Sequence, residues 1–397
     1  MKKIKKIVGL ILSLCLTFGA FSSIVSLAAE EAGAEAAYEK NMESAYTAMR
    51  FKEEFLFITV SRSVQSSELV YPDNFGGIYI DDNNELHITY TENKETLMNK
   101  VGEDEAIFEK VDYGYNYLCE IYEYITNLMA DIPITHVGIS ETNNRICVSV
   151  DLDYRTQLID ILEENCVNFK KEAISFFDSQ IITTTAAAGT GIIMSLGGCT
   201  AGYNAQDYDG NYGFVTCGHA ASGLWETVYN LDGSTLGTVT YRSYISGTKV
   251  DASFVEYENQ SEKSSQYLGT ESLVGTISSA SLSEGMNVSK YGNKTGEQSG
   301  TIIYVTCSVL IEEKYANGQI INRQLFDQIY LDIRQEKGDS GALLVLPMVG
   351  PVLGNTTRPC QAIGIVTLGE EDVWEKGWAS KIENINSRFD LTTYIVV

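Results

Sequence analysis

Apolar and polar residues alternate in two segments of the N-terminal half of the chain. The segment Phe75–Thr91 alternates on both sides of the polar stretch Asp81–Asn84, which predicts a β-hairpin that turns there. The segment His136–Asp151 alternates in the same way around Asn143-Asn144 and predicts a second hairpin. The two Asn-Asn turns lie sixty residues apart with similar flanks, which indicates an internal duplication.

A spacing of three to four residues between apolar positions predicts two helices in the same half. The first helix presents one apolar face, made by Leu118, Ile121, Ile125 and Leu128, and ends at Asp131-Ile-Pro133. The second runs from Leu158 to Phe169. Together with the hairpins they predict a small α+β domain whose sequence holds no group of residues suited to catalysis.

Downstream of about Gly189 the pattern changes to short runs rich in Gly, Ser, Thr, Tyr and Val. Turn sequences interrupt these runs at Asp209-Gly210, Asp232-Gly233, Gly292-Asn293 and Asn317-Gly318, and a helical spacing returns only in Lys381–Phe389. About 200 residues of this kind predict an all-β fold, either a sandwich or a pair of barrels.

The N-terminus predicts export. Met1–Lys6 is basic, Ile7–Leu27 is apolar, and Ser26-Leu-Ala28 has the small residues at which a signal peptidase cuts. We therefore assign residues 1–28 to a signal peptide. The apolar run is also long enough for a membrane anchor, but the small residues at its end and the acidic stretch after it favour cleavage. No later apolar run is long enough for a membrane, so we expect no membrane association after the signal is removed.

The charge of the remaining chain excludes polyanionic partners. Residues 30–183 hold 11 Lys and Arg against 30 Asp and Glu, and residues 184–397 hold 13 against 23. Binding to nucleic acid or to anionic lipid needs clustered cations. We expect neither partner.

Cysteine counts differ between the two halves. Without Cys15, three cysteines remain upstream, namely Cys119, Cys147 and Cys166, and four remain downstream. Export favours disulfides, and an even number permits two bridges in the downstream half.

A lone histidine in the downstream half is the first candidate for chemistry. His219 ends the apolar run "GFVTCGHA", and a single histidine in such a place is more often structural than catalytic. Two further segments supply partners: "KVDASFVEY" begins a strand at Asp251, and "EKGDSGALLV" places Ser340 in a turn before a strand.

These three residue types complement one another chemically. A serine hydroxyl needs a base to take its proton, an imidazole has a suitable pKa, and a buried carboxylate fixes the imidazole tautomer. Gly338 lets its own N–H and that of Ser340 converge on an oxyanion. No metal-binding motif is present, so neither a metal nor another cofactor is expected.

The order His219, Asp251, Ser340 resembles that of the chymotrypsin-like serine endopeptidases, and the motifs resemble the bacterial α-lytic protease and streptogrisin group. Further similar motifs are "YGNKTGEQSGTI", "GIVTLGE" and the upstream hairpin "FGGIYIDDNNELHITYT", which is similar to the pro-region of this group. The resemblance implies two antiparallel β-barrels preceded by a small α+β pro-domain. It also implies a pro-region over residues 29–183 and a protease domain over residues 184–397.

The resemblance implies a secreted, extracellular bacterial enzyme that acts as a monomer on proteins or peptides, with its own pro-region as a partner in cis. Two other possibilities remain. One is a protease-like fold that has become an inactive, secreted binding module. The other is a mature two-domain enzyme that keeps the upstream domain.

The sequence departs from the family pattern near the site. The cysteine of the histidine motif stands two residues earlier, at Cys217. Because export is oxidising and the downstream count is even, we expect bridges from Cys199 to Cys217 and from Cys307 to Cys360. The pocket for the side chain before the scissile bond would include Arg334, Lys337 and Thr367. A cationic pocket would favour cleavage after Glu or Asp, whereas an Arg334 that points to solvent would leave a pocket for apolar residues. In both cases cleavage after Lys or Arg is disfavoured.

Overall fold

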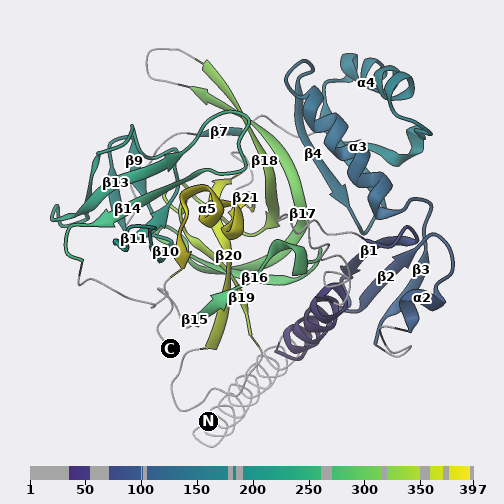
Figure 1. The fold of residues 1–397 in the computed structure, drawn as a ribbon, viewed down its shortest axis with the longest axis horizontal. Coiled ribbons are helices and arrows are strands. Elements are labelled where there is room, and N and C mark those ends of the chain that lie inside the picture. The colour runs from purple at the N-terminus through teal and green to yellow at the C-terminus, as the bar shows by residue number, and fades with distance from the viewer. Residues whose placement is uncertain are drawn as a thin grey trace, which may run out of the picture.

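The computed structural model describes residues 35–53, 71–99, 101, 105–177, 182–184, 191–260, 271–314, 320–348, 358–369 and 375–393. The predicted signal peptide, with Cys15, lies outside the described residues. None of the helices in the described ranges has the length and apolar character needed to cross a membrane. Figure 1 shows an N-terminal region beside two bodies of strands.

The N-terminal region contains both predicted hairpins and both predicted helices. A helix occupies residues 35–53 and is followed by β1 (Phe75–Ile80), β2 (Leu86–Tyr90), α2 (Glu95–Met98), β3 (Ile107–Lys110), α3 (Tyr115–Leu128), β4 (Ile134–Ser140), β5 (Arg145–Val150), α4 (Leu152–Asn165), a 3-10 turn (Lys171–Ala173) and β6 (Ile174–Phe177). Helix α4 begins directly after Asp151 and ends before the predicted Phe169, because its C-cap Cys166 is already extended.

The region consists of two units with the same order of elements. In each unit a helix precedes a hairpin, a second helix follows, and the last strand pairs parallel with the second strand of the hairpin: β3 with β2, and β6 with β5. Both hairpins turn through a left-handed asparagine, Asn84 with φ 60° and Asn144 with φ 49°. The shared topology agrees with the duplication that the sequence indicates.

The first body of strands is a single antiparallel sheet, which we call the first barrel. Its strands are β8 (Ile192–Met194), β9 (Gly197–Cys199), β10 (Tyr203–Gln206), β11 (Tyr212–Thr216), β12 (Thr227–Asn230), β13 (Thr235–Ser243) and β14 (Ala252–Tyr257), and the C-terminal β22 (Thr392–Thr393) pairs with β10. The turns at Asp209-Gly210 and Asp232-Gly233 join neighbouring strands, as predicted. Buried apolar residues of these strands fill the interior.

The second body is a closed barrel. Its strands are β16 (Asn287–Gly292), β17 (Gly296–Lys314), β18 (Ile320–Asp332), β19 (Leu343–Pro347), β20 (Arg358–Gly369) and β21 (Lys376–Lys381), with β15 (Glu271–Thr276) added beside β20. The order β16-β19-β20-β21-β18-β17 closes because β16 also pairs with β17. Helix α5 (Ile382–Phe389) follows, close to the predicted range. The predicted all-β fold with two antiparallel barrels is confirmed.

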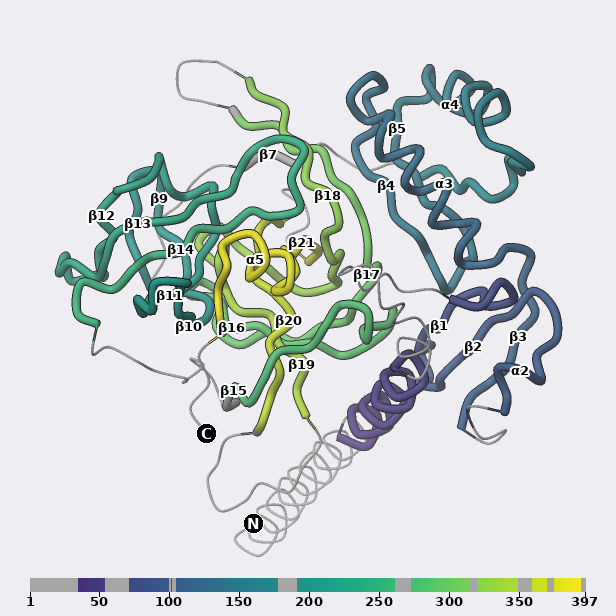
Figure 2. The backbone as a smooth tube through the Cα atoms, in the orientation of Figure 1, coloured from purple at the N-terminus to yellow at the C-terminus, as the bar shows by residue number. Residues whose placement is uncertain are grey.

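The long hairpin β17–β18 joins the three parts. Figure 2 shows it between the first barrel and the N-terminal region. Toward the first barrel, Gly247 N donates to Gln324 O at 2.9 Å and Phe326 N donates to Thr248 O at 2.9 Å. Toward the N-terminal region, β17 pairs antiparallel with β4, so that β4, β5 and β6 extend the sheet of the second barrel.

Buried charges also lie at this junction. The carboxylate of Glu284 accepts hydrogen bonds from Glu141 N (2.9 Å) and Thr142 N (3.0 Å) in the turn between β4 and β5. Lys52 Nζ lies 3.9 Å from Glu141 Oε1, with both side chains 4% exposed. Burial, together with the neighbouring Glu141, raises the pKa of Glu284 to about 8. The two parts therefore share a buried polar contact as well as an apolar core.

His136 of β4 lies in an aromatic cage at the same junction. The cage consists of Phe177, Tyr304, Tyr330 and Trp378, with ring centroids 5.3, 5.8, 5.1 and 5.9 Å from that of His136. Within the described ranges, neither ring nitrogen of His136 has a hydrogen-bond partner. Burial lowers the pKa of His136 to about 3.

We expect the β4–β17 contact to weaken on acidification. Because the folded-state pKa of His136 lies below its ordinary value of about 6.5, its contribution is complete above that pH and is lost as pH falls toward about 3. Because one proton binds to His136 when β4 separates from β17, the equilibrium constant for their contact falls by up to about tenfold per pH unit. Amide hydrogen exchange of β4 and β17 in the full chain, corrected for intrinsic pH dependence, measures this loss.

The His136→Phe variant keeps a ring in the cage and should remove the acidic dependence. Glu284 acts in the opposite direction, since its raised pKa means that its contribution is lost as pH rises through about 8. Glu284→Gln should therefore remove a loss of stability between about pH 4.5 and 8, opposite in sign to the effect of His136. An unaltered acid dependence in His136→Phe would refute the role of this histidine.

The predicted disulfides are not formed in the described residues. None of their seven cysteines forms a disulfide. Cys199 Sγ lies 3.5 Å from Met194 Sδ and 3.4 Å from Thr216 Oγ1. Cys307 donates to Gln328 O at 3.3 Å and packs in a different core cluster from Cys360. An even count of cysteines carries no information on the direction of their Cβ atoms, which decides whether two sulfurs can join.

Candidate active site

His219 and Asp251 meet because their strands are neighbours. β11 ends three residues before His219, β14 begins directly after Asp251, and the two strands pair with Thr216 opposite Ser253. His219 Nδ1 lies 2.7 Å from Asp251 Oδ2. The other carboxylate oxygen accepts hydrogen bonds from Gly218 N (2.8 Å) and His219 N (2.9 Å). Asp251 thus orients both the ring and the backbone of the histidine.

Gly218 is required for this close approach. A Cβ at that position would lie 2.6 Å from Ser243 O and 2.8 Å from Ala252 O, both of which are backbone atoms. Any larger residue would push the histidine segment away from β14. Packing alone therefore requires the glycine of the "CGH" sequence, whatever the chemistry of the histidine.

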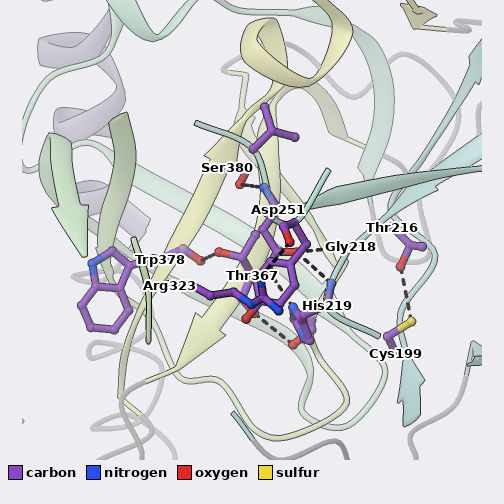
Figure 3. A network of polar contacts seen from close by, with 12 residues as sticks. Cys199, Thr216, Gly218, His219, Asp251, Arg323, Thr367, Trp378 and Ser380 are labelled. Carbon is purple, nitrogen blue, oxygen red and sulfur yellow. Dashed lines mark hydrogen bonds and ion pairs between the residues drawn. The ribbon is translucent and has the colours of Figure 1, made fainter. Parts of the chain in front are cut away.

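The fully buried Asp251 is held by a chain of hydrogen bonds from the second barrel. Asp251 N donates to Ser380 Oγ (3.0 Å), and that hydroxyl donates to Gln328 Oε1 (2.9 Å). Gln328 Nε2 donates back to Lys249 O (2.9 Å). Figure 3 shows Ser380, Asp251, Gly218 and His219 in this network. Sequence reasoning did not find Ser380 or Gln328, because Ser380 lies 129 residues from Asp251 and Gln328 lies 52 residues from Ser380.

The environment of His219 strengthens it as a base. Burial lowers the pKa of His219, but the neighbouring Cys217 and Asp251 side chains raise it by more, so the net direction is upward. The Cys217 thiol itself has its pKa raised, first by burial and then by Cys199. Cys217 therefore stays protonated at neutral pH, and we attribute the effect on His219 to the Asp251 carboxylate.

Ser340 stands in a turn between the second barrel's strands. Gly338 and Gly341 on either side have φ of 110° and 91°, which side chains rarely tolerate. Asp339 N donates to Glu336 O and Ala342 N donates to Asp339 O, both at 2.9 Å. Neither the N–H of Gly338 nor that of Ser340 has an acceptor within the described residues. The turn thus presents two free donors, on either side of Asp339.

Thr200 fixes this turn from the first barrel. Its N–H donates to Ser340 O at 2.8 Å, and its hydroxyl donates to Gly338 O at 2.8 Å. Gly341 packs against the same side, where a Cβ would lie 2.2 Å from Thr200 O. Thr200 therefore brings the serine turn to the barrel that carries His219. Nothing in the sequence around Thr200 points to this contact.

The Ser340 hydroxyl donates to Thr367 O at 3.1 Å. Thr367 is buried within β20, and its own hydroxyl donates to Trp378 O at 3.2 Å. Catalytic hydrogen bonds are often long or misaligned before substrate binds. The serine lies at the junction of the barrels with its hydroxyl directed to the β20 backbone.

Asp339 anchors the turn in the second barrel. Its carboxylate lies 2.7 Å from Lys290 Nζ, with the two side chains 1% and 0% exposed. It also accepts hydrogen bonds from Lys294 N (2.8 Å) and from the N–H and hydroxyl of Thr295 (3.1 and 2.7 Å). Burial raises the pKa of Asp339, but Lys290 and these donors lower it by more. The buried carboxylate thus stays ionised.

The two barrels carry His219 and Asp251 on one side and Ser340 on the other. The chain has the chymotrypsin-like fold. The resemblance in the sequence is thereby confirmed at the level of fold.

Solved structures of bacterial serine proteases are similar to about half of this chain. Nocardiopsis protease is 20% identical over 52% of this chain and 96% of its own, with a TM-score of 0.35. Cellulomonas bogoriensis chymotrypsin is 21% identical over 52% and 97%, with 0.36. Thermobifida fusca protease A is 22% identical over 53% and 100%, with 0.37. No protein-family model matches the chain.

The three predicted pocket residues differ in how far they are exposed to solvent. Arg334 is exposed and pairs with Glu336 at 2.7 Å, Lys337 is half-buried, and Thr367 is buried in the sheet. The buried side chain of this segment is Gln335, which contacts Gly377 so closely that a Cβ there would lie 2.1 Å from Gln335 Nε2. The sequence-based prediction named the charged Arg334 and Lys337 as pocket residues and did not include the uncharged Gln335 between them.

The described part of the chain contains no group of three His, Cys, Asp or Glu side chains placed to hold a metal ion. The chemistry available at this site is that of an imidazole, a carboxylate, a hydroxyl and two free N–H donors.

Proposed function

We propose that the protein is a secreted serine endopeptidase that hydrolyses peptide bonds through His219, Asp251 and Ser340. The observation that carries the proposal is the 2.7 Å contact between His219 Nδ1 and the buried Asp251, together with a serine turn that presents two free N–H donors and is held to the same barrel by Thr200. This arrangement supplies a base, its orienting carboxylate, a nucleophile and an oxyanion site.

In the proposed mechanism a rotation of the Ser340 side chain turns its hydroxyl from Thr367 O toward His219 Nε2. His219 takes the hydroxyl proton as Ser340 Oγ attacks the substrate carbonyl, and the N–H groups of Gly338 and Ser340 stabilise the oxyanion. His219 then gives the proton to the leaving amine. A water molecule, deprotonated in turn by His219, hydrolyses the acyl-enzyme.

We further propose that residues 29–183 form a pro-region that assists folding and is removed. Supporting contacts are the pairing of β4 with β17, the buried bonds from the β4–β5 turn to Glu284, and a core cluster shared by both parts. Paired barrels have many non-local contacts and fold slowly without help. For selectivity, the exposed Arg334 and its pairing with Glu336 favour the version in which the pocket accepts apolar residues.

An inactive binding module is the second candidate. The hydrogen bond from the Ser340 hydroxyl to Thr367 O favours it, because that hydroxyl donates to a backbone carbonyl of β20. The endopeptidase and the binding module therefore differ in whether Ser340 Oγ reacts as a nucleophile.

Labelling of the secreted protein with a serine-directed phosphonate, followed by peptide mapping, tests the proposal. We expect one labelled residue, Ser340, and no label after His219→Ala, since the hydroxyl then has no base. The same map should give a mature N-terminus near residue 184. An unlabelled Ser340 in the wild-type protein would leave only the binding module, and a retained upstream region would indicate a mature two-domain protein.

A further inference from the structure

Large apolar side chains are exposed on two loops beside the candidate active site. The loop from His219 to β12 exposes Leu224 (52%) and Trp225 (74%), and the turn between β8 and β9 exposes Leu196 (43%). Leu196 N donates to Ala220 O at 3.1 Å, so the two loops lie side by side directly after the catalytic histidine. We call Leu196, Leu224 and Trp225 the apolar platform. An isolated exposed apolar side chain needs no explanation, but three on adjoining loops suggest a contact surface.

The backbone holds Trp225 in an unfavourable conformation. Its φ is 67°, in the left-handed region that bulky side chains avoid. Hydrogen bonds from Trp225 N to Val239 O (2.8 Å) and from Val239 N to Glu226 O (2.9 Å) tie both sides of this residue to β13. Strain of this kind persists where the surroundings enforce it, and it concentrates at functional sites. The fold therefore enforces an exposed tryptophan and leaves its ring uncovered.

A carboxylate clamp holds the two loops together. Glu226 accepts hydrogen bonds from Ser222 N (2.6 Å), from Ser222 Oγ (2.8 Å) and from Ser195 N. The hydroxyls of Ser195 and Ser222 also lie 2.9 Å apart. The platform is thus built on fixed backbone, which lowers the entropy lost when a ligand binds.

The chemistry of the site decides which part of a substrate passes here. His219 must give its proton to the leaving amine, so the leaving side of the substrate passes on the His219 side of Ser340. Thr200 N, at the end of β9, donates to Ser340 O on this same side, whereas Arg334–Gly338 and β20 belong to the other barrel. The loops of the platform belong to the leaving side.

We infer that the apolar platform binds an apolar side chain of the substrate within the first few residues after the scissile bond, with Trp225 as its main contact. This inference rests on the proposed function. By the same geometry the platform binds an incoming amine in the reverse reaction. There the amine nitrogen attacks the acyl ester, an amide bond forms, the bond to Ser340 Oγ breaks, and His219 passes the amine proton to that oxygen.

The test measures this reverse step. A peptide ester that lacks residues after the scissile bond forms the acyl-enzyme, and its partition between water and an added dipeptide amide is followed by chromatography. Phenylalanyl-leucinamide should capture the acyl group about tenfold better than glycyl-glycinamide in the wild type, the lower range for one apolar contact. Trp225→Gly, which suits a positive φ, and Trp225→Ala should both bring this ratio below about threefold while ester hydrolysis stays unchanged.

Tyr208→Ala is the matched control. Tyr208 is 81% exposed in the turn between β10 and β11. The serine turn lies at the opposite end of β10, since a Cβ on Gly202 would lie 2.5 Å from Gly341 O. The capture ratio should be unaffected. If both Trp225 variants keep the wild-type ratio, the platform has no such role although the enzyme is active. If the wild type fails to hydrolyse the ester, the proposed function fails, and the inference fails with it.

Discussion

Replacement of Ser340 by alanine should reduce kcat/KM for peptide hydrolysis by about three to six orders of magnitude. The free donors of Gly338 and Ser340 and the substrate contacts would remain, and they account for the residual rate. The fold should be little affected, since the hydroxyl makes one hydrogen bond, to Thr367 O at 3.1 Å. Steady-state kinetics with a peptide substrate and a circular dichroism spectrum measure the two effects separately.

Ser299→Ala is the control for this prediction. Ser299 is exposed on β17 and its hydroxyl lies 3.0 Å from that of Ser289, so its replacement removes a similar hydroxyl that has no contact with His219, Asp251 or Ser340 in the described residues. Its activity should equal that of the wild type. Near-normal turnover by Ser340→Ala would remove this serine from the mechanism and with it the enzyme assignment.

Replacement of Lys290 by methionine should destabilise the protein by about 3–5 kcal/mol, the usual cost of removing one partner of a buried ion pair. The Asp339 carboxylate, 1% exposed and 2.7 Å from Lys290 Nζ, would lose its only close cation in the described part of the chain. Activity should fall as well, because Asp339 lies between the two donors, Gly338 and Ser340. Urea denaturation measures the stability, and peptide hydrolysis measures the displacement of the turn.

The same substitution at an exposed ion pair gives the reference value. Lys249 Nζ lies 3.3 Å from Asp327 Oδ2 and its side chain is 60% exposed, so Lys249→Met should cost at most about 1 kcal/mol. The double variant Lys290→Met/Asp339→Asn should lose less stability than the two single variants together, since it leaves no unpaired buried charge. A cost for Lys290→Met no larger than that of Lys249→Met would show that the pair does not hold the turn.

The sequence by itself determined the local elements and the residue types of the candidate site. Alternation around Asp81–Asn84 and Asn143-Asn144 predicted two hairpins that the structure contains, because side chains on alternate faces of a strand repeat every second residue. The motifs around His219, Asp251 and Ser340 are short, and each depends on neighbours in the sequence. The end of α4, by contrast, was predicted four residues too late.

Only the tertiary structure decided which distant residues support the site. Thr200 holds the serine turn across 138 residues, Ser380 reaches Asp251 across 129, and the cysteines remain thiols. Such contacts depend on how barrels dock and on where each Cβ points, and neither is encoded within a window of sequence. The same holds for the platform: the sequence shows Leu196 and Trp225 as two unrelated apolar residues, and the hydrogen bond from Leu196 to Ala220 brings their loops together beside His219.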